Sequence, residues 1–420
     1  MQMILLYYLS LVFIRLPPFL LPFGITTHIV FRIINVILIF YLFFRKETII
    51  GKKPLIIFSL IYFVSQAISI FAALNLQIYL YFFERLVSVF LFFMLTMYFL
   101  KKHPNSKKTF IRIIYVTAAI NALIELTIFF NPQTVDFFYH FIHKDVLDIL
   151  VFNINRGRLF FESYGEIFIP VFLYALFFEK KSNLNKTLLI LLVIVVTLLA
   201  FWSNYRDRFL TAVFGFIGFI FVYAGEIKKI KFAKVILITA CFFLAVIFGL
   251  IYINDKLGFS VINRLLLENQ QDIETLYTRE QLIGNAVAIG LTHPLIGVGL
   301  GNYYDHLPSS TKNKQYLLVG DGKTFYSATL LYPHNLFAQT FAETGILGIF
   351  SLLLLLGIFA KEDILTIRKN KSLKASLVVS FWLLIFYAMF NPRSPLQYFS
   401  LFFMLRALIE AYSIRSTTKS

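Results

Sequence analysis

The chain has 420 residues, of which 59% are hydrophobic and only 15% charged, and its mean hydropathy is +0.77. A water-soluble domain cannot hide 51 phenylalanines in one core, which excludes a soluble protein and predicts one that crosses a membrane several times. The single cysteine, Cys241, lies within an apolar run, which excludes an internal disulfide bond and a cysteine metal cluster. A chain that crosses a membrane several times must also accommodate the formal net charge of +17.

Apolar runs long enough to cross about 30 Å of hydrocarbon recur about twelve times. They predict an all-α fold, a polytopic bundle of about 12 transmembrane helices that forms one membrane domain over residues 1–420. The first run is too long for the core of a signal peptide and lacks a small-residue cleavage site, so we expect a retained span. The expected spans are residues 3–23, 28–44, 54–73, 77–100, 110–131, 164–178, 187–202, 208–224, 234–253, 335–359, 375–390 and 395–412, the last two being alternatively one re-entrant pair.

Lysine and arginine gather in alternate connections between these spans. Because basic residues accumulate on the cytoplasmic side, we expect both termini in the cytoplasm. The net charge is then an orientation signal that also suits an anionic lipid leaflet. Nucleic acid is excluded as a partner, since the basic residues are scattered over short connections without interleaved aromatic residues. The basic connections are residues 45–53, 101–108, 179–186, 225–234 and 361–374, together with the C-terminal tail.

The opposite, extracytoplasmic side receives two long connections, residues 132–163 and 254–334. The second is predicted to be a large loop that contains short helices. The clearest of these covers residues 278–294, where an amphipathic pattern ends at a proline. Its apolar face is formed by Leu282, Ala286 and Ile289.

Three glycines at alternate positions follow this helix, in the stretch LIGVGLGNYYDHLP (295–308). Gly297, Gly299 and Gly301 allow a tight backbone path that side chains would obstruct. Their spacing is not that of a dinucleotide-binding fingerprint, and no strand precedes them. We therefore expect a closely turning backbone here and no nucleotide site.

Arginines on the expected outer side are candidates for binding an anion. Arginine at the end of a span often reaches lipid headgroups, and for each residue alone that ordinary interpretation stays open. Several arginines on one side of the membrane together favour a membrane-anchored phosphate or diphosphate. The candidates are Arg206 and Arg208 in a very short turn between two spans, Arg279 at the start of the 278–294 helix, and Arg158 beside Arg156 and Glu162.

His334 is the candidate for catalysis. It follows Pro333 and precedes the expected span 335–359, so it should lie at the N-terminus of that helix. The helix dipole there favours a nearby anion and a neutral imidazole, which can accept a proton as a general base. The alternative is an interfacial histidine that bonds a backbone carbonyl. Asn335 is expected to cap the helix or to orient its neighbour.

Glu343 lies inside the same span and is expected to have a different role. At about 100° per residue it falls on roughly the opposite helix face from His334, so we do not expect it to be the proton partner. We expect it to pack between helices, where Gly345 and Gly348 allow close approach.

Four stretches resemble the O-antigen ligase and O-antigen polymerase superfamily of bacterial envelope glycosyltransferases. THPLIGVGLGNYY (292–304), followed by PHNLFAQTFAETGILGIF (333–350), is similar to the signature of that superfamily. TREQLIGNA (278–286) resembles its arginine-led helix, and SNYRDRFLTAVFGF (203–216) resembles its short arginine turn. The resemblance implies a GT-C-like membrane bundle with a large extracytoplasmic loop.

The resemblance also implies a metal-independent, inverting glycosyltransferase of the bacterial inner membrane. Its donor would be an undecaprenyl-diphosphate-linked glycan, its active site extracytoplasmic, and it would need no cofactor. Arg206 and Arg279 would hold the diphosphate and His334 would deprotonate the acceptor. Arg208 stays an alternative to Arg206, because an aspartate and a second arginine depart from the family pattern in this turn. Further candidates are Arg158, Glu162 and Asn335.

Two reactions are expected within the superfamily. A polymerase joins lipid-linked repeat units of O-antigen, capsular polysaccharide or exopolysaccharide, and we favour it because nothing in the loops is specific to lipid A-core. A ligase transfers the glycan to lipid A-core in lipopolysaccharide biosynthesis. The expected partners are the lipid-linked donor, an acceptor glycan on a lipid carrier or lipid A-core, the lipid bilayer, a chain-length regulator and a flippase.

A secondary transporter or a lipid-linked oligosaccharide flippase is the alternative of another class. Such proteins usually show related halves and ionisable residues near the middle of the membrane. Glu84, Arg85 and Glu125 are the candidates for buried ionisable residues, and no half-to-half repeat is evident. The single long outer loop near the C-terminal third favours an enzyme.

Overall fold

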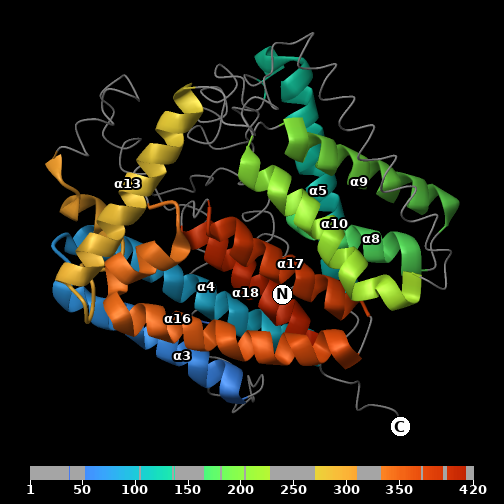
Figure 1. The fold of residues 1–420 in the computed structure, drawn as a ribbon. Helices are drawn as coiled ribbons and strands as arrows, with labels where there is room; N and C mark the ends of the chain where they lie inside the picture. The colour runs from blue at the N-terminus through green and yellow to red at the C-terminus, as the bar shows by residue number, and fades with distance from the viewer. Residues whose placement is uncertain are drawn as a thin grey trace, which may run out of the picture.

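The computed structural model describes residues 53–103, 106–134, 165–179, 182–202, 205–227, 270–309, 333–369, 372–390 and 395–412, together with residues 37 and 137. Over this part of the chain the backbone forms α-helices and short 3-10 helices joined by turns, without a strand (Figure 1). The predicted all-α fold is confirmed for these residues.

The long helices in chain order are α3 (Lys53–Ile68), α4 (Leu76–Lys102), α5 (Ser106–Phe130), α8 (Ile169–Phe178), α9 (Asn183–Trp202), α10 (Arg206–Ile227), α13 (Gln270–Thr292), α16 (Leu336–Lys369), α17 (Leu373–Ala388) and α18 (Pro395–Ala411). The 3-10 helices are η2 (Ser69–Ala72), η3 (Pro132–Thr134), η4 (Gly165–Phe168) and η6 (Asn302–His306). Each long helix except α13 coincides with an expected span. The expected spans 3–23, 28–44 and 234–253, and with the last of them Cys241, lie outside the described residues.

Five of the described helices are long and apolar enough to cross a membrane, and three shorter ones are apolar. Large apolar side chains cover their outward faces: Phe221 is 81% exposed and Leu184 is 70% exposed, an arrangement that suits lipid and not water. The chain is therefore an integral membrane protein, while the number of twelve spans stays a prediction. The five segments are Leu76–Leu100, Ser106–Ile128, Asn183–Phe201, Arg206–Glu226 and Leu336–Arg368.

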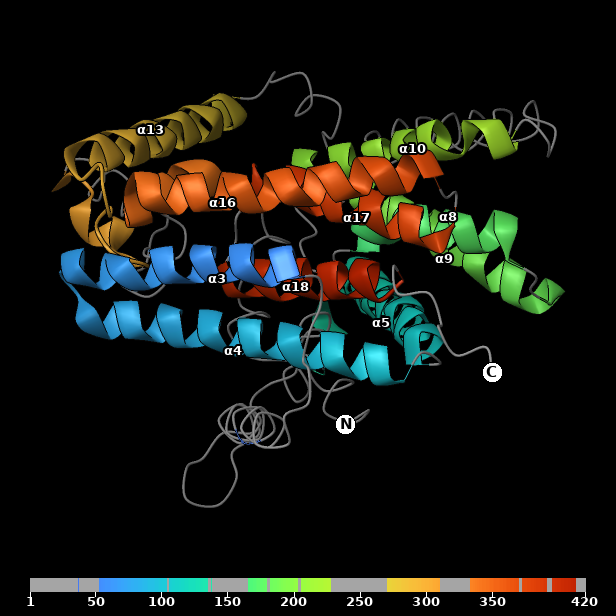
Figure 2. The ribbon, with the colours of Figure 1, turned by 90° about the horizontal axis from the view of Figure 1, so that it is seen from below.

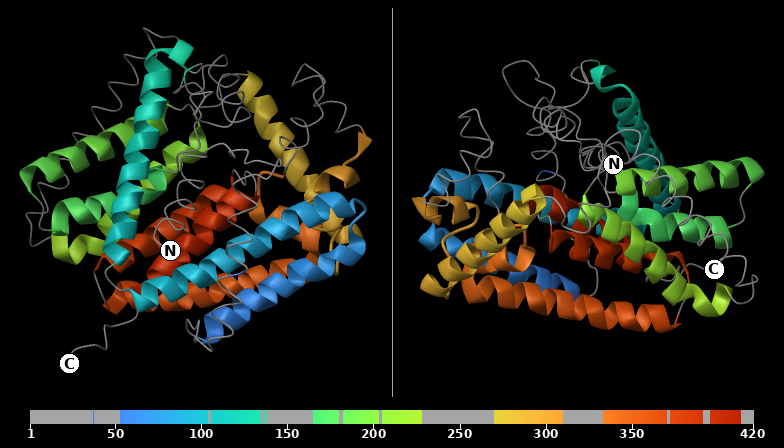
Figure 3. Two further views of the ribbon diagram at one scale, coloured as in Figure 1. Left: turned by 180° about the vertical axis from the view of Figure 1, so that it is seen from behind. Right: turned by 45° about the horizontal axis from the view of Figure 1, so that its top comes forward.

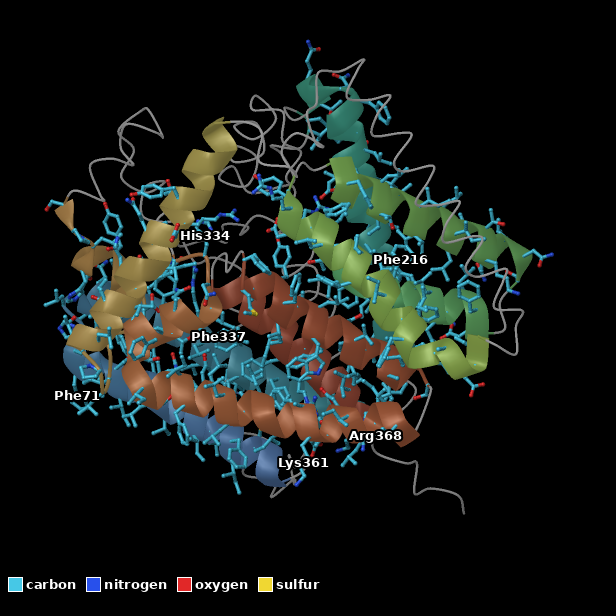
Figure 4. All side chains as sticks on the ribbon, in the orientation of Figure 1. Phe71, Phe216, His334, Phe337, Lys361 and Arg368 are labelled. Atoms are coloured by element: carbon cyan, nitrogen blue, oxygen red, sulfur yellow. The ribbon has the colours of Figure 1, made fainter. Side chains whose placement is uncertain are left out.

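The helices pack as a bundle in which α16 lies between α3 and α13, α4 runs along α18, and α17 contacts α8, α10 and α18 (Figure 2). Phenylalanine rings fill the interfaces, as where Phe93 of α4 meets Phe403 of α18 with 5.3 Å between the ring centroids. His334, just before α16, lies at the opposite end of the bundle from Lys361 and Arg368, in the last turns of the same helix (Figure 4).

A buried arginine ties the Lys361 end of the bundle together. Arg406 of α18 donates from Nη1 to Oδ1 of Asp363 at 2.8 Å and from Nη2 to Oε2 of Glu362 at 3.1 Å, and it also pairs with Glu410. The indole N–H of Trp382 donates to the other oxygen of Asp363 at 3.0 Å. A buried charge is stable only when an opposite charge pairs with it. The Arg406 cluster therefore holds α16, α17 and α18 together.

Candidate functional site

His334 lies in the turn that leads into α16. With a φ of 49°, it is the one residue other than glycine in the described part of the chain that has a positive φ. A left-handed backbone costs such a residue about 1 kcal/mol or more, and it persists where the surroundings over-determine it, which is common at functional sites. The side chain is half-buried on the α13 side of the bundle (Figure 4). The expected position at the start of this helix is confirmed.

Asn335 caps α16. Its Oδ1 accepts the backbone N–H of Ala338 at 3.0 Å, and its carbonyl oxygen accepts the N–H of Gln339 at 2.9 Å. These bonds satisfy amides that the start of a helix leaves without a helical partner. Its side-chain amide also donates to the carbonyl oxygen of Met389, just after α17, at 3.4 Å. Asn335 therefore holds the backbone next to His334 against both the start of α16 and the end of α17.

The helix that follows is not continuous. Gly345 has φ 62° and ψ −159°, which lie outside the helical region, and α16 changes direction there (Figures 1 and 2). The expected span 335–359 is present as a long apolar helix, but it contains this break and continues to Lys369. A broken helix at membrane depth needs other groups to satisfy the backbone that the break exposes.

Residues 294–302, which we call the glycine loop, supply those groups. The N–H of Val298 donates to the carbonyl oxygen of Ala342 at 3.0 Å, on one side of the break. On the other side the N–H of Ile346 donates to the carbonyl oxygen of Pro294 at 2.8 Å. The glycine loop and the break in α16 thus form one backbone-paired unit.

The pairing requires glycine on both partners. A Cβ atom on Gly297 would lie 2.3 Å from the carbonyl carbon of Glu343, and one on Gly345 would lie 2.5 Å from the carbonyl oxygen of Leu295. Both glycines also have positive φ, which an L side chain rarely adopts. The expected tight path through Gly297, Gly299 and Gly301 is confirmed, since all three have positive φ.

Helix α13, which contains Arg279, packs on the first segment of α16. The helix begins at Gln270 and ends at Thr292, so it is longer than the expected 278–294, and Arg279 lies in its interior and not at its start. The expected apolar face of Leu282, Ala286 and Ile289 is buried, and it packs on Ala338 and Ala342 of α16. Arg279 itself is half-buried.

Tyr303 fastens the end of the glycine loop to the same helix. Its hydroxyl donates to the carbonyl oxygen of Leu282 at 2.7 Å, and burial raises the pKa of this hydroxyl. The side chain is fully buried, so it is not open for stacking on a sugar.

Arg206 is the first residue of α10 and is half-buried. The first turn of a helix presents backbone N–H groups and the positive end of the dipole, which makes it favourable for an anion. The next residue, Asp207, is buried and belongs to the same turn. Arg206 therefore lies where a diphosphate would meet both a guanidinium and the amides of a helix start.

Arg208 has a different environment. It is only 2% exposed, its Nε donates to Oε1 of Glu166 at 3.1 Å, and its Nη2 lies 3.3 Å from Oε2 of Glu125. Both carboxylates are buried as well. As an alternative diphosphate ligand Arg208 is unsuited, because two protein carboxylates already hold its guanidinium inside the bundle. It joins α10 to α5 and η4.

Several sequence candidates lie elsewhere. Arg158 and Glu162 fall outside the described residues. Of the residues considered for a transporter, Glu125 is buried as expected, but Glu84 is exposed and Arg85 is half-buried with its guanidinium 3.6 Å from the ring centroid of Tyr81. Sequence reasoning missed Glu166, for which an acidic residue within an apolar run was the only available signal.

Arg206, Arg279 and His334 come from three segments far apart in the sequence. Arg206 begins α10, which packs on α8, α9 and α17, whereas Arg279 belongs to α13, which packs on α16, and His334 lies in the turn before α16 (Figures 1 and 3). The helix start at Arg206 is favourable for an anion, and the half-buried imidazole of His334 can accept a proton. The convergence of the three residues on one site stays a prediction.

Residues 188–353 match the Wzy_C family, described as O-antigen ligase. Over these residues the chain is similar to O-antigen ligases. The matched region begins in α9, includes α10, α13 and the glycine loop, and ends in α16 beyond the break. Arg206, Arg279 and His334 all lie within it. The match, together with the apolar helices, supports a membrane protein that is similar to O-antigen ligases over residues 188–353. No curated protein matches the chain.

Proposed function

We propose that the protein transfers an undecaprenyl-diphosphate-linked oligosaccharide to a sugar hydroxyl on the extracytoplasmic face of the bacterial inner membrane. The observation that carries the proposal is the position of His334, which has a left-handed backbone at the capped start of α16, inside the region that matches O-antigen ligase. The basic residues at the other end of α16 support an extracytoplasmic site, because such residues favour the cytoplasmic side.

In the proposed mechanism His334 accepts the proton of the acceptor hydroxyl as its oxygen attacks the anomeric carbon of the donor. The bond between that carbon and the diphosphate oxygen breaks, and undecaprenyl diphosphate leaves with the electron pair. Attack opposite the leaving group inverts the anomeric carbon. A general base placed in this way contributes about 10²–10⁴-fold to the rate.

Arg206 and Arg279 hold the diphosphate in this mechanism. The leaving group gains negative charge as the bond breaks, so guanidinium groups and the N–H groups at the start of α10 stabilise the transition state more than the ground state. In other diphosphate sites a divalent metal balances the negative charge of the leaving group. Here guanidinium groups and helix amides balance it, so the proposed mechanism is metal-independent.

We take polymerisation of O-antigen, capsular or exopolysaccharide repeat units as the reaction, with transfer to lipid A-core as the alternative. The two reactions share the donor, the base and the leaving group, and they differ only in the acceptor. A chain-length regulator and a flippase are proposed partners for the polymerase reaction.

The test is reconstitution of the purified protein in liposomes with an undecaprenyl-diphosphate-linked oligosaccharide, alone and with lipid A-core. Longer chains on the lipid carrier support the polymerase, and glycan on lipid A-core supports the ligase. Movement of intact donor between leaflets without a new glycosidic bond would contradict both and favour a flippase.

A further inference from the structure

Asn302, at the end of the glycine loop, is a fully buried polar residue. Its side-chain Oδ1 accepts the backbone N–H of Asn75 at 2.6 Å, and its Nδ2 donates to the backbone carbonyl oxygen of the same residue at 3.3 Å. Nδ2 also donates to the carbonyl oxygen of Leu300, inside the loop, at 3.2 Å. An asparagine side chain has two donor hydrogens and one acceptor oxygen, so both donors and the acceptor of Asn302 bond to backbone. This side chain therefore joins segments of the protein and is not turned toward a ligand.

The partner residue, Asn75, is the N-cap of α4. Its own side chain accepts the N–H of Ile78 at 3.1 Å, inside the first turn of that helix. The backbone N–H of a capping residue has no partner within its helix, and Asn302 supplies the acceptor. Asn302 consequently binds the backbone of residue 75 and not its side chain.

The segment around Asn75, residues 69–75, connects α3 to α4, and we call it the α3–α4 turn. The hydroxyl of Tyr79, in the first turn of α4, donates to the carbonyl oxygens of Gln66 and Ala67 at 3.0 Å each, in the last turn of α3. Helix α3 in turn packs along α16. The α3–α4 turn is therefore a fixed support for whatever is bonded to it.

Two residues of the glycine loop lie directly against this support. A Cβ atom on Gly299 would lie 2.7 Å from Cα of Ala73, and one on Gly301 would lie 2.3 Å from the ring of Phe82 in α4. The α3–α4 turn and the glycine loop meet at one end of the bundle (Figure 2). This close approach is independent of the hydrogen bonds of Asn302, and both observations place the loop on the start of α4.

The other sides of the glycine loop reach the helices of the proposed site. Its backbone pairs with the break in α16, and the hydroxyl of Tyr303, next to Asn302, bonds to the carbonyl oxygen of Leu282 in α13. His334 lies just before α16, and Arg279 belongs to α13. Because protein interiors are closely packed, a loop that moves away from α4 would displace both helices.

We propose that Asn302 is a positioning residue: it clamps the glycine loop to the α3–α4 turn and so keeps α13, with Arg279, and the start of α16, with His334, in one arrangement. The clamp itself rests only on the contacts above, whereas its effect on glycan transfer rests on the proposed function. A misplacement of about 1 Å between reacting groups can reduce a rate by about 10²-fold, which is the upper scale of the effect expected here.

The clamp is tested without reference to activity, by hydrogen exchange of the full chain in lipid nanodiscs, read by mass spectrometry. Asn302→Asp keeps the size and one acceptor oxygen but puts an oxygen in place of the donor that faces two carbonyl groups. The amides of residues 73–79 and 296–303 should then exchange at least about tenfold faster, because lost hydrogen bonds lower the free energy of local opening. Unchanged exchange would overturn the clamp.

The matched control is the same chemical change on the other side of the clamp. Asn75→Asp keeps a capping oxygen and the backbone N–H that Asn302 binds, so exchange should stay within about twofold of the parent. Equal opening by both variants would overturn the clamp. The parent protein gives a test that needs no variant, since rapid exchange of the Asn75 amide there would also contradict the clamp.

The functional consequence is tested by turnover in liposomes. Asn302→Asp should lower kcat of glycan transfer by about 10- to 100-fold and raise the donor KM, whereas Asn75→Asp should keep both close to the parent. A residue that only supports folding would reduce the yield of monodisperse protein and leave both constants of the folded fraction unchanged. That result would overturn the positioning role.

The outcomes separate the clamp from the proposed function. If Asn302→Asp lowers kcat while exchange of the loop is unchanged, Asn302 acts on the substrate and the positioning role is wrong. If the parent protein transfers no glycan but exchange still rises after Asn302→Asp, the clamp holds and the proposed function fails.

Discussion

At the scale of single residues, the two arginines at the start of α10 show how neighbours in sequence take different roles. Arg206 and Arg208 are two positions apart, which at about 100° per residue places them on roughly opposite faces of a helix. One is half-buried at the helix start, and the other is enclosed by Glu125 and Glu166. The sequence alone could not separate them, because the two carboxylates come from distant segments.

We predict that Arg208→Ala destabilises the protein by about 3–5 kcal/mol, because it leaves two buried carboxylates without their cation. Arg206→Ala should weaken donor binding and leave stability nearly unchanged. Arg368→Ala, at an exposed position in the opposite end of the bundle, is the matched control and should change stability by no more than about 0.5 kcal/mol. Thermal unfolding in detergent and donor binding measure the two effects. A stable Arg208→Ala protein that loses only donor binding would restore Arg208 as a diphosphate ligand.

At the scale of elements, the break in α16 is the feature that the sequence did not reveal. Hydropathy reports the length of an apolar run and not the continuity of its backbone, so it predicts a span over residues 335–359 without revealing the break. The groups that satisfy the break come from Pro294 and Val298, about fifty residues earlier in the chain. By contrast, the buried face of α13 and the tight path of the glycine loop follow from local patterns and could be predicted.

The break makes a direct prediction about glycine substitutions in one helix. Gly345→Ala should destabilise the protein by about 1–3 kcal/mol or more, since it forces a side chain into positive φ and against the backbone of Leu295. Gly357 lies in the same helix, and a Cβ atom added there would meet nothing within 4 Å, so Gly357→Ala should be neutral or stabilising by up to about 1 kcal/mol. Thermal unfolding of Gly345→Ala and Gly357→Ala measures this difference. Equal stability of the two variants would show that α16 is continuous.

At the scale of the whole molecule, the candidate site and the basic residues of α16 lie at opposite ends of the bundle. Lys361 and Arg368 lie at one end, and the glycine loop and His334 lie at the other (Figure 4). By the positive-inside rule we expect the first of these ends in the cytoplasm. The orientation stays a prediction from composition, whereas the packing of α13 on α16 joins segments distant in the sequence and could not be predicted.

The orientation is tested by labelling single cysteines in a Cys241→Ser background. Ser309→Cys, just beyond η6, and Lys361→Cys, near the end of α16, both place a thiol at an exposed position. In intact spheroplasts an impermeant maleimide should label position 309 and should label position 361 only after the membrane is permeabilised. The reverse pattern would place His334 in the cytoplasm and contradict the proposed reaction.

The central claim, that His334 is the general base of a glycan transfer, is tested most directly by comparing two histidine variants in liposomes. His293 is the matched control, because it is exposed, lies in the same region that matches O-antigen ligase, and has its imidazole beside Thr292 and the ring of His306. We expect His334→Ala to bind the lipid-linked donor normally and to transfer glycan at least about 100-fold more slowly, and His293→Ala to transfer at close to the parent rate. Transfer by His334→Ala at the parent rate would contradict the account.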